Sequence, residues 1–205
     1  MILRELLEAV EVLSMGGDLN VAITGITYDS RQVQPGFLFV AVKGFKSDGH
    51  DYIQESLALG AAAVVVERRE ALLPGVSWAV VPDTRRALAL LSARFFGNPS
   101  AGLKMIGVTG TNGKTTTTNL IASILNYAGL KVGLIGTIHN KIGDRILPVK
   151  NTTPESTDLQ ALLKEMAAEG VEACVMEVSS HALALHRVEG CEFDLAVFTN
   201  LSQDH

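Results

Sequence analysis

The chain has 205 residues, enough for one large domain or two small ones. Its residues are 47% hydrophobic and 19% charged, which excludes a disordered chain because there is enough apolar surface to bury a core. The net charge of -5, from 17 basic and 22 acidic residues, argues against a general nucleic-acid binder, which needs a basic face.

Two features indicate the cellular compartment. No apolar run approaches the roughly 20 residues that a membrane span needs, and charges interrupt the N-terminal stretch MILRELLEAVEVL, unlike the core of a signal peptide. Cys174 and Cys191 lie beside apolar runs without a CxxC or CxxH pairing, which favours small buried thiols in a reducing compartment. We therefore expect a cytoplasmic protein that does not insert into membranes.

The first half of the chain alternates helix-like with strand-like runs. The expected helices cover 3–13, 51–61 and 84–96, the last of them capped by Asp83. One expected strand begins at 22, and three others cover 37–44, 61–67 and 78–82. Strands alternating with helices predict an α/β layer fold, so residues 1–98 are expected to form a small α/β domain.

A second α/β unit is expected over 99–205, after a segment rich in glycine, proline and serine at 96–104 that is typical of a linker. Its expected helices cover 118–130, with Gly129 as the stop, and a run that starts at Asp158. Its expected strands cover 104–109, 131–137, a hairpin within 139–149 that turns at Gly143, and two central apolar strands at 172–179 and 193–200. The chain ends on a polar loop directly after a core strand, which is typical of the front part of a longer protein.

The stretch GVTGTNGKTTTTNL, residues 107–120, has the features of a phosphate-binding loop. Glycines allow backbone N–H groups to approach phosphate oxygens, and the following helix start favours an anion. Lys114 can reach the outer phosphates, and the Thr115 hydroxyl can hold magnesium. The strict pattern G-x-x-x-x-G-K-[ST] fails, because Val108 stands where its first glycine belongs and Gly107 lies one place early. An ordinary glycine-rich turn is the alternative, but a lysine followed by four threonines is a poor helix start without another purpose.

Five ordered motifs resemble the Mur ligase family. TGTNGKTTTTNLI resembles the ATP-binding loop of these ligases and of their relative folylpolyglutamate synthase, a loop that also lacks the first glycine. Residues 26–53 resemble the N-terminal UDP-binding domain of the family, while NTTPES, MEVSSHALALHRV and FTNLSQDH resemble successive motifs of its central domain. The resemblance covers the whole chain, with a UDP-sugar-binding domain at 1–98 and the front part of a P-loop, doubly wound α/β ATP-binding domain at 99–205.

The resemblance implies an ATP-dependent, magnesium-dependent amide-forming ligase of peptidoglycan synthesis. Such an enzyme adds meso-diaminopimelate or L-lysine to UDP-N-acetylmuramoyl-L-alanyl-D-glutamate through an acyl phosphate, and the whole enzyme is expected to be a monomer. The carbamylated lysine and the C-terminal amino-acid pocket of the family fall beyond residue 205, so this chain alone is expected not to ligate.

The resemblance also implies the roles of individual residues. The nucleotide is expected to contact Gly110, Thr111, Asn112, Gly113, Lys114, Thr115 and Thr116. Catalysis is expected to depend on Lys114, Glu177 and His205, and magnesium to bind Thr115, Glu177 and His205. The sugar–peptide substrate is expected to contact Ser30, Asn151, Thr152, Thr153, Ser179 and Arg187, with Phe45, Lys46 and Ser47 either a second uridine contact or an ordinary turn. His50 and His139 are interpreted as surface residues.

Three alternative functions are weaker. Folylpolyglutamate synthase lacks the N-terminal DSR, PG and DGH segment, and a non-catalytic UDP-sugar-binding module would not need Lys114, Thr115 and Glu177. A P-loop GTPase would need an NKxD-type guanine motif, which TNLSQD does not supply.

Overall fold

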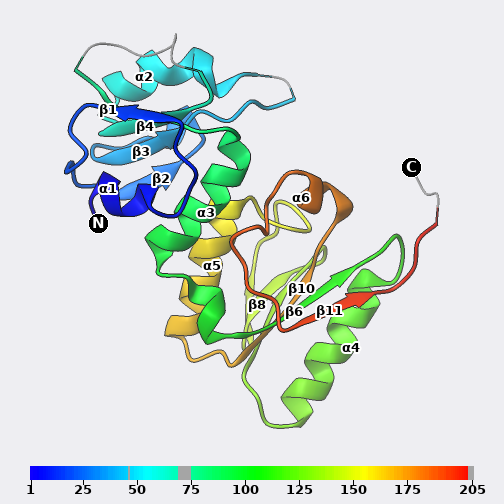
Figure 1. The fold of residues 1–205 in the computed structure, drawn as a ribbon. Helices are drawn as coiled ribbons and strands as arrows, with labels where there is room; N and C mark the ends of the chain where they lie inside the picture. The colour runs from blue at the N-terminus through cyan, green and yellow to red at the C-terminus, as the bar shows by residue number, and fades with distance from the viewer. Residues whose placement is uncertain (46, 69–74, 203–205) are drawn as a thin grey trace. The chain divides into compact units, whose positions relative to one another are not determined.

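The computed structural model describes residues 1–45, 47–68 and 75–202. The chain divides into two compact units, Met1–Phe95 and Phe96–His205, and each contains a largely parallel sheet (Figure 1). The predicted α/β fold class is confirmed. Within the described ranges, no helix is both long enough and apolar enough to cross a membrane.

The first unit is built on a five-stranded sheet of order β1-β5-β4-β3-β2, in which only β1 runs antiparallel. The strands are β1 (Ser14–Gly16), β2 (Gly25–Thr27), β3 (Phe37–Val40), β4 (Ala63–Val66) and β5 (Ser77–Val80). The helices are α1 (Leu3–Leu7), η1 (Ser30–Gln32), η2 (Gly49–Tyr52), α2 (Ile53–Ala58) and α3 (Thr84–Phe96). Alternate strand residues point to opposite faces, so Leu38 and Val65 pack with α1 and α3, while Phe39 and Val64 pack with Ile53 of α2.

The predicted N-terminal helix is too long. It ends at Leu7, and the chain then extends so that the Leu13 amide donates to the Val80 carbonyl at the start of β1. Val10 and Val12 pack against the core at a two-residue spacing. Leucine periodicity indicated a helix, but the chain turns at its end, where the Val10 amide donates to the Leu7 carbonyl, and then leads into β1.

The second unit contains a six-stranded sheet of order β11-β6-β10-β7-β8-β9. The strands are β6 (Lys104–Thr109), β7 (Val132–Ile135), β8 (Asn140–Ile142), β9 (Arg145–Leu147), β10 (Ala173–Glu177) and β11 (Leu195–Phe198). The helices are η4 (Pro99–Gly102), α4 (Lys114–Tyr127), α5 (Ser156–Ala168) and α6 (Ser180–Ala184). Leu163 of α5 packs in the cluster of Met176, while Ala122 of α4 packs with Val175 in the other cluster, so the two helices serve opposite faces of the sheet.

Several predictions for this unit are confirmed and two need correction. The hairpin turns at Gly143, and β10 is buried between β6 and β7. However, α5 begins at Ser156, so Asp158 lies in its first turn. Among the described residues β11 pairs only with β6, at a sheet edge, where Phe198 is 62% exposed. An apolar run predicts a strand but not its place in the strand order, because that place depends on which partner it meets.

Candidate functional site

The glycines of the loop between β6 and α4 are required by its geometry. Gly110 and Gly113 have φ angles of 129° and 84°, which side chains rarely adopt. A Cβ at Gly110 would lie 2.2 Å from Thr199 Oγ1, whereas a Cβ at Gly113 would meet no atom within 4 Å. The loop therefore packs closely on one side and faces open space on the other.

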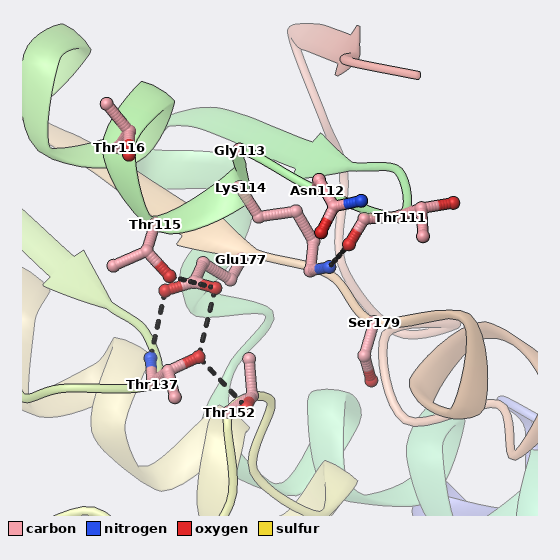
Figure 2. Close-up of a pocket in the computed structure, with 10 residues that line it drawn as sticks. All are labelled: Thr111, Asn112, Gly113, Lys114, Thr115, Thr116, Thr137, Thr152, Glu177 and Ser179. Carbon is pink, nitrogen blue, oxygen red and sulfur yellow. Dashed lines mark hydrogen bonds between the residues drawn. The ribbon is translucent and has the colours of Figure 1, made fainter. Parts of the chain in front are cut away.

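That open space is a cavity of about 340 Å³ at the N-terminus of α4 (Figure 2). Its lining combines most of the predicted loop with residues from three other segments, namely Thr111, Asn112, Gly113, Lys114, Thr115, Thr116, Thr137, Thr152, Glu177 and Ser179. Because α4 spans 14 residues and its first N–H groups have no partner within the helix, its N-terminus offers donors and a partial positive charge to an anion in this cavity.

Lys114 folds back over the loop. Its Nζ donates to the carbonyl oxygens of Gly110 at 2.7 Å and of Thr111 at 2.9 Å. An ammonium group has three donors, so one remains for a ligand in the cavity. The lysine therefore stabilises the loop and also supplies a positive charge to it.

Glu177 ends β10 at the floor of the cavity and is 1% exposed. Its Oε2 accepts from the Thr115 hydroxyl at 3.0 Å and from the Thr137 hydroxyl at 3.0 Å, and its Oε1 accepts from the Thr137 amide at 2.9 Å (Figure 2). The predicted pair of Thr115 and Glu177 is thus brought together by the ends of neighbouring elements, since β10 lies beside β6, which feeds the loop.

Thr137 was missed by sequence reasoning, although its position carried a signal. It follows β7, which is parallel to β10, and the carboxyl ends of parallel strands meet at one edge of a sheet. Its hydroxyl also lies 3.1 Å from the hydroxyl of Thr152. This contact joins the Glu177 cluster to the segment 151–153.

The predicted substrate contacts of this unit separate into two groups. Thr152 and Ser179 line the cavity, and the Ser179 hydroxyl also caps α6 by accepting from Ala182 N at 3.1 Å. Thr153 is 1% exposed, and its hydroxyl donates to Glu177 O at 2.8 Å while accepting from Ser179 N at 3.1 Å. The buried Thr153 side chain therefore joins the 151–153 segment to the backbone of Glu177 and Ser179.

Arg187 also bonds to the segment that contains Thr153. Its Nη1 donates to the Thr153 carbonyl at 3.0 Å, and its Nη2 forms an ion pair with Glu155, directly before α5. Asn151, at the start of the same segment, is exposed. The structure thus gives Arg187 a role in fixing the 151–155 segment.

The segment 199–202 fastens the loop, which sequence reasoning also missed. The Asn200 side chain accepts from Asn112 N at 3.1 Å and donates to Asn112 O at 3.1 Å. Thr199 Oγ1 donates to Asn112 O at 2.7 Å, and the Thr111 hydroxyl exchanges two 3.0 Å bonds with the backbone of Ser202. His205 and Lys46 lie outside the described residues.

Ser30 belongs to the first unit, where it is 8% exposed at the start of η1. Asp29 caps η1, and the bonds from Arg31 lower the pKa of the Asp29 carboxyl despite partial burial. In the same unit the interpretation of His50 as a surface residue is wrong: it is 7% exposed, with Nδ1 2.6 Å from Asp48 Oδ1 and Nε2 accepting from Glu67 N.

The cavity residues suit a magnesium nucleotide. A carboxylate and a threonine hydroxyl are the oxygen ligands that Mg²⁺ prefers, and Thr115 Oγ1 and Glu177 Oε2 converge within 3.0 Å. The glycine-lined helix start can hold phosphates. Among the described residues, which stop at 202, there is no cluster of three His, Cys, Asp or Glu.

Sequence comparisons identify both units. A family model described as "Mur ligase family, catalytic domain" matches residues 22–96, and one described as "Mur ligase middle domain" matches 108–205. UDP-N-acetylmuramoyl-L-alanyl-D-glutamate--2,6-diaminopimelate ligase of Caldanaerobacter subterraneus subsp. tengcongensis is 54% identical over 92% of this chain and 39% of its own length. The ligase of the same name from Alkaliphilus metalliredigens is 50% identical over 99% of this chain and 41% of its own.

Solved structures agree with these matches. A structure of a UDP-N-acetylmuramoyl-L-alanyl-D-glutamate--2,6-diaminopimelate ligase is 31% identical, with a TM-score of 0.81 over 100% of this chain and 42% of its own. The MurF ligase of Thermotoga maritima in complex with ADP is 27% identical, with a TM-score of 0.58 over 88% of this chain and 38% of its own. The chain spans about two fifths of the length of these relatives. With both of its units matched, the chain belongs to the Mur ligase family.

Proposed function

We propose that the chain is the N-terminal portion of UDP-N-acetylmuramoyl-tripeptide synthetase (MurE), an ATP- and magnesium-dependent ligase of peptidoglycan synthesis. The observation that carries the proposal is the cavity at the N-terminus of α4, where Lys114, Thr115 and Glu177 converge. The names of the similar ligases favour 2,6-diaminopimelate over L-lysine as the added amino acid. We place the enzyme in the cytoplasm as a monomer, without nucleic-acid or membrane partners.

In the proposed reaction ATP supplies the phosphoryl group that activates the D-glutamate carboxylate of UDP-N-acetylmuramoyl-L-alanyl-D-glutamate, and Mg²⁺ neutralises charge between the two anions. The chain's own residues bind and orient these groups. The N–H groups at the start of α4 and the remaining donor of Lys114 hold phosphate oxygens, and Thr115 and Glu177 hold the metal. His205 is proposed as a further metal ligand.

Each unit contributes its own residues to the proposed contacts with the sugar–peptide substrate. Ser30 in the first unit is proposed to contact the uridine end, which makes residues 1–98 the UDP-sugar-binding domain. Thr152 and Ser179 in the second unit line the cavity where the activated carboxylate must arrive. Asn151, Thr153 and Arg187 complete the proposed set, the last two by holding the segment in place. With two fifths of the relatives' length, the chain is proposed to bind substrates without joining them.

A thermal-shift titration tests this function. UDP-N-acetylmuramoyl-L-alanyl-D-glutamate, UMP and magnesium–ATP are added separately, and each ligand at 100 times its Kd should stabilise the chain by about 2.7 kcal/mol. Shifts with both the UDP-sugar peptide and magnesium–ATP are expected. A shift with magnesium–ATP alone would contradict the UDP-sugar assignment and point to another ATP-dependent ligase of the family.

A further inference from the structure

We propose that Thr137 is a positioning residue that fixes the Glu177 carboxylate and orients the Thr152 hydroxyl, so that the metal side of the cavity is linked to the substrate segment. The inference rests on the proposed function, because it takes Glu177 as a magnesium ligand and Thr152 as a substrate contact. Thr137 itself would bind neither group.

Thr137 holds both oxygens of the carboxylate. Its amide donates to Glu177 Oε1 at 2.9 Å, and its hydroxyl donates to Oε2 at 3.0 Å. Two donors from one residue set the plane of the carboxylate as well as its position. Glu177 is 1% exposed, so its carboxylate depends on protein donors such as these, although Thr137 itself is exposed at the cavity.

The preceding residue makes this approach possible. A Cβ at Gly136 would lie 2.5 Å from Glu177 Oε1, closer than real contacts allow. The Gly136 amide also donates to Asn140 Oδ1 at 3.2 Å, which holds the turn in place. The Gly136–Thr137 turn is therefore shaped around the carboxylate.

The hydrogens of this cluster can be assigned by counting donors. A carboxylate only accepts, and Thr137 has one hydroxyl hydrogen, which its bond to Oε2 uses. In the 3.1 Å contact between the two hydroxyls, Thr152 must therefore be the donor. The chain of bonds then runs in one direction, from Thr152 to Thr137 to Glu177 (Figure 2).

This direction has a consequence for the substrate. The single hydrogen of Thr152 is committed to Thr137, so only its lone pairs remain for the cavity that it lines. Thr152 is then suited to accept from a donor, such as a peptide N–H of the substrate, and not to donate to a carboxylate or phosphate oxygen. Removing the Thr137 hydroxyl frees that hydrogen and loosens Glu177 at the same time.

Calorimetric titration with ADP, in magnesium and in EDTA, tests the inference. Because partners of metal-ligating carboxylates typically contribute 10- to 100-fold to metal affinity, Thr137→Val should reduce the magnesium-dependent gain in ADP affinity by at least about tenfold. Binding in EDTA should not change. Thr137→Ser, which restores the hydroxyl, should recover the gain, whereas a loss caused only by altered packing would not be rescued in this way.

Thr118→Val is the matched control. Thr118 is buried on α4 near the cavity, but its hydroxyl donates to the Thr115 carbonyl within the helix. It should leave the magnesium-dependent gain unchanged, and thermal melts of all variants separate folding losses from binding losses.

A double-mutant cycle tests the link to the substrate segment. Thr152→Val should lower the magnesium-dependent gain in the wild-type background and have no further effect in the Thr137→Val background, because it acts through Thr137. A full effect in both backgrounds, or wild-type binding of magnesium–ADP by Thr137→Val, would overturn the inference alone. A wild-type chain whose ADP binding ignores magnesium would instead overturn the proposed function on which the inference rests.

Discussion

Helices α3 and α4 each begin shortly after a strand, and their N-termini are completed in opposite ways. At α3, Thr84 N donates to Glu67 Oε1 at 2.9 Å, and the Asp83 carboxylate accepts from Arg85 N at 2.8 Å and Arg86 N at 2.9 Å. At α4, the N-cap is Gly113, which has no side chain with which to cap the helix, and the N-terminus faces the cavity. Protein carboxylates thus do at α3 what a bound anion is proposed to do at α4.

The two glutamates that follow central strands show the same contrast. Glu67 follows β4, is exposed, and uses one oxygen to bind both the amide and the hydroxyl of Thr84. Glu177 ends β10, is buried, and uses both oxygens beside the cavity. A carboxylate at the end of a strand is therefore no sign of a site by itself; the space left beside it distinguishes the two.

The largest expected effect comes from Lys114→Ala. Losing one bond to a charged phosphate and the two bonds that hold the loop should weaken magnesium–ADP binding about 100-fold. UDP-sugar binding should persist, because Ser30 lies in the other unit. Calorimetry with each ligand measures both effects, and Lys131→Ala, which removes an exposed ammonium bonded to Glu169 O, is the control. Loss of UDP-sugar binding in Lys114→Ala would break the division of roles between the units.

A smaller loss is expected for Asn200→Ala. The Asn200 side-chain oxygen and nitrogen both bond to the Asn112 backbone. Truncating the side chain should therefore loosen the loop before α4 and weaken magnesium–ADP binding about tenfold. The exposed Asn126 on α4 supplies the control variant, Asn126→Ala. Equal affinities of the two variants would show that the loop holds its shape without this fastening.

Changes at the capped N-terminus of α3 should alter the stability of the fold and not ligand binding. Asp83→Ala removes the cap of α3 and should cost about 1 kcal/mol of unfolding free energy, whereas Asp83→Asn, which keeps a capping oxygen, should cost less. Urea unfolding followed by the fluorescence of Trp78, the single tryptophan, reports on this unit. Unchanged stability of Asp83→Ala would remove the basis of the comparison.

The smallest effect is a pH dependence of the first unit. Burial opposes ionisation of Asp48, but its bonds with His50 and the charge of Arg68 outweigh this and lower the pKa of the carboxyl. A lowered pKa stabilises the fold above the ordinary value of 3.8, and the stabilisation is lost as the pH falls through the lowered pKa. Between pH 7 and pH 3, wild-type unfolding free energy should therefore fall more than that of Asp48→Asn; parallel profiles would contradict this.

Burial also raises the pKa of both cysteines, to about 12 for Cys191, where the hydrogen bond from Gln160 only partly offsets it. Neither thiol therefore has appreciable thiolate at neutral pH. The prediction of small buried thiols is confirmed for Cys174, whereas Cys191 is only partly buried; both pack in the cluster around α5.

Local chemistry was sufficient to predict the α/β class, the loop and the pairing of Lys114 and Thr115 at a helix start, because those features depend on neighbours in the chain. It did not determine that the N-terminal helix ends at Leu7, that β11 lies at an edge, or that His50 is buried, because each depends on partners distant in sequence. The roles of Thr137 and Asn200 were missed as well, because the bonds that define them join residues distant in sequence. Only the parallel order β11-β6-β10-β7 brings those strand ends to one cavity, and only there do their hydroxyl and amide groups hold Glu177 and the loop.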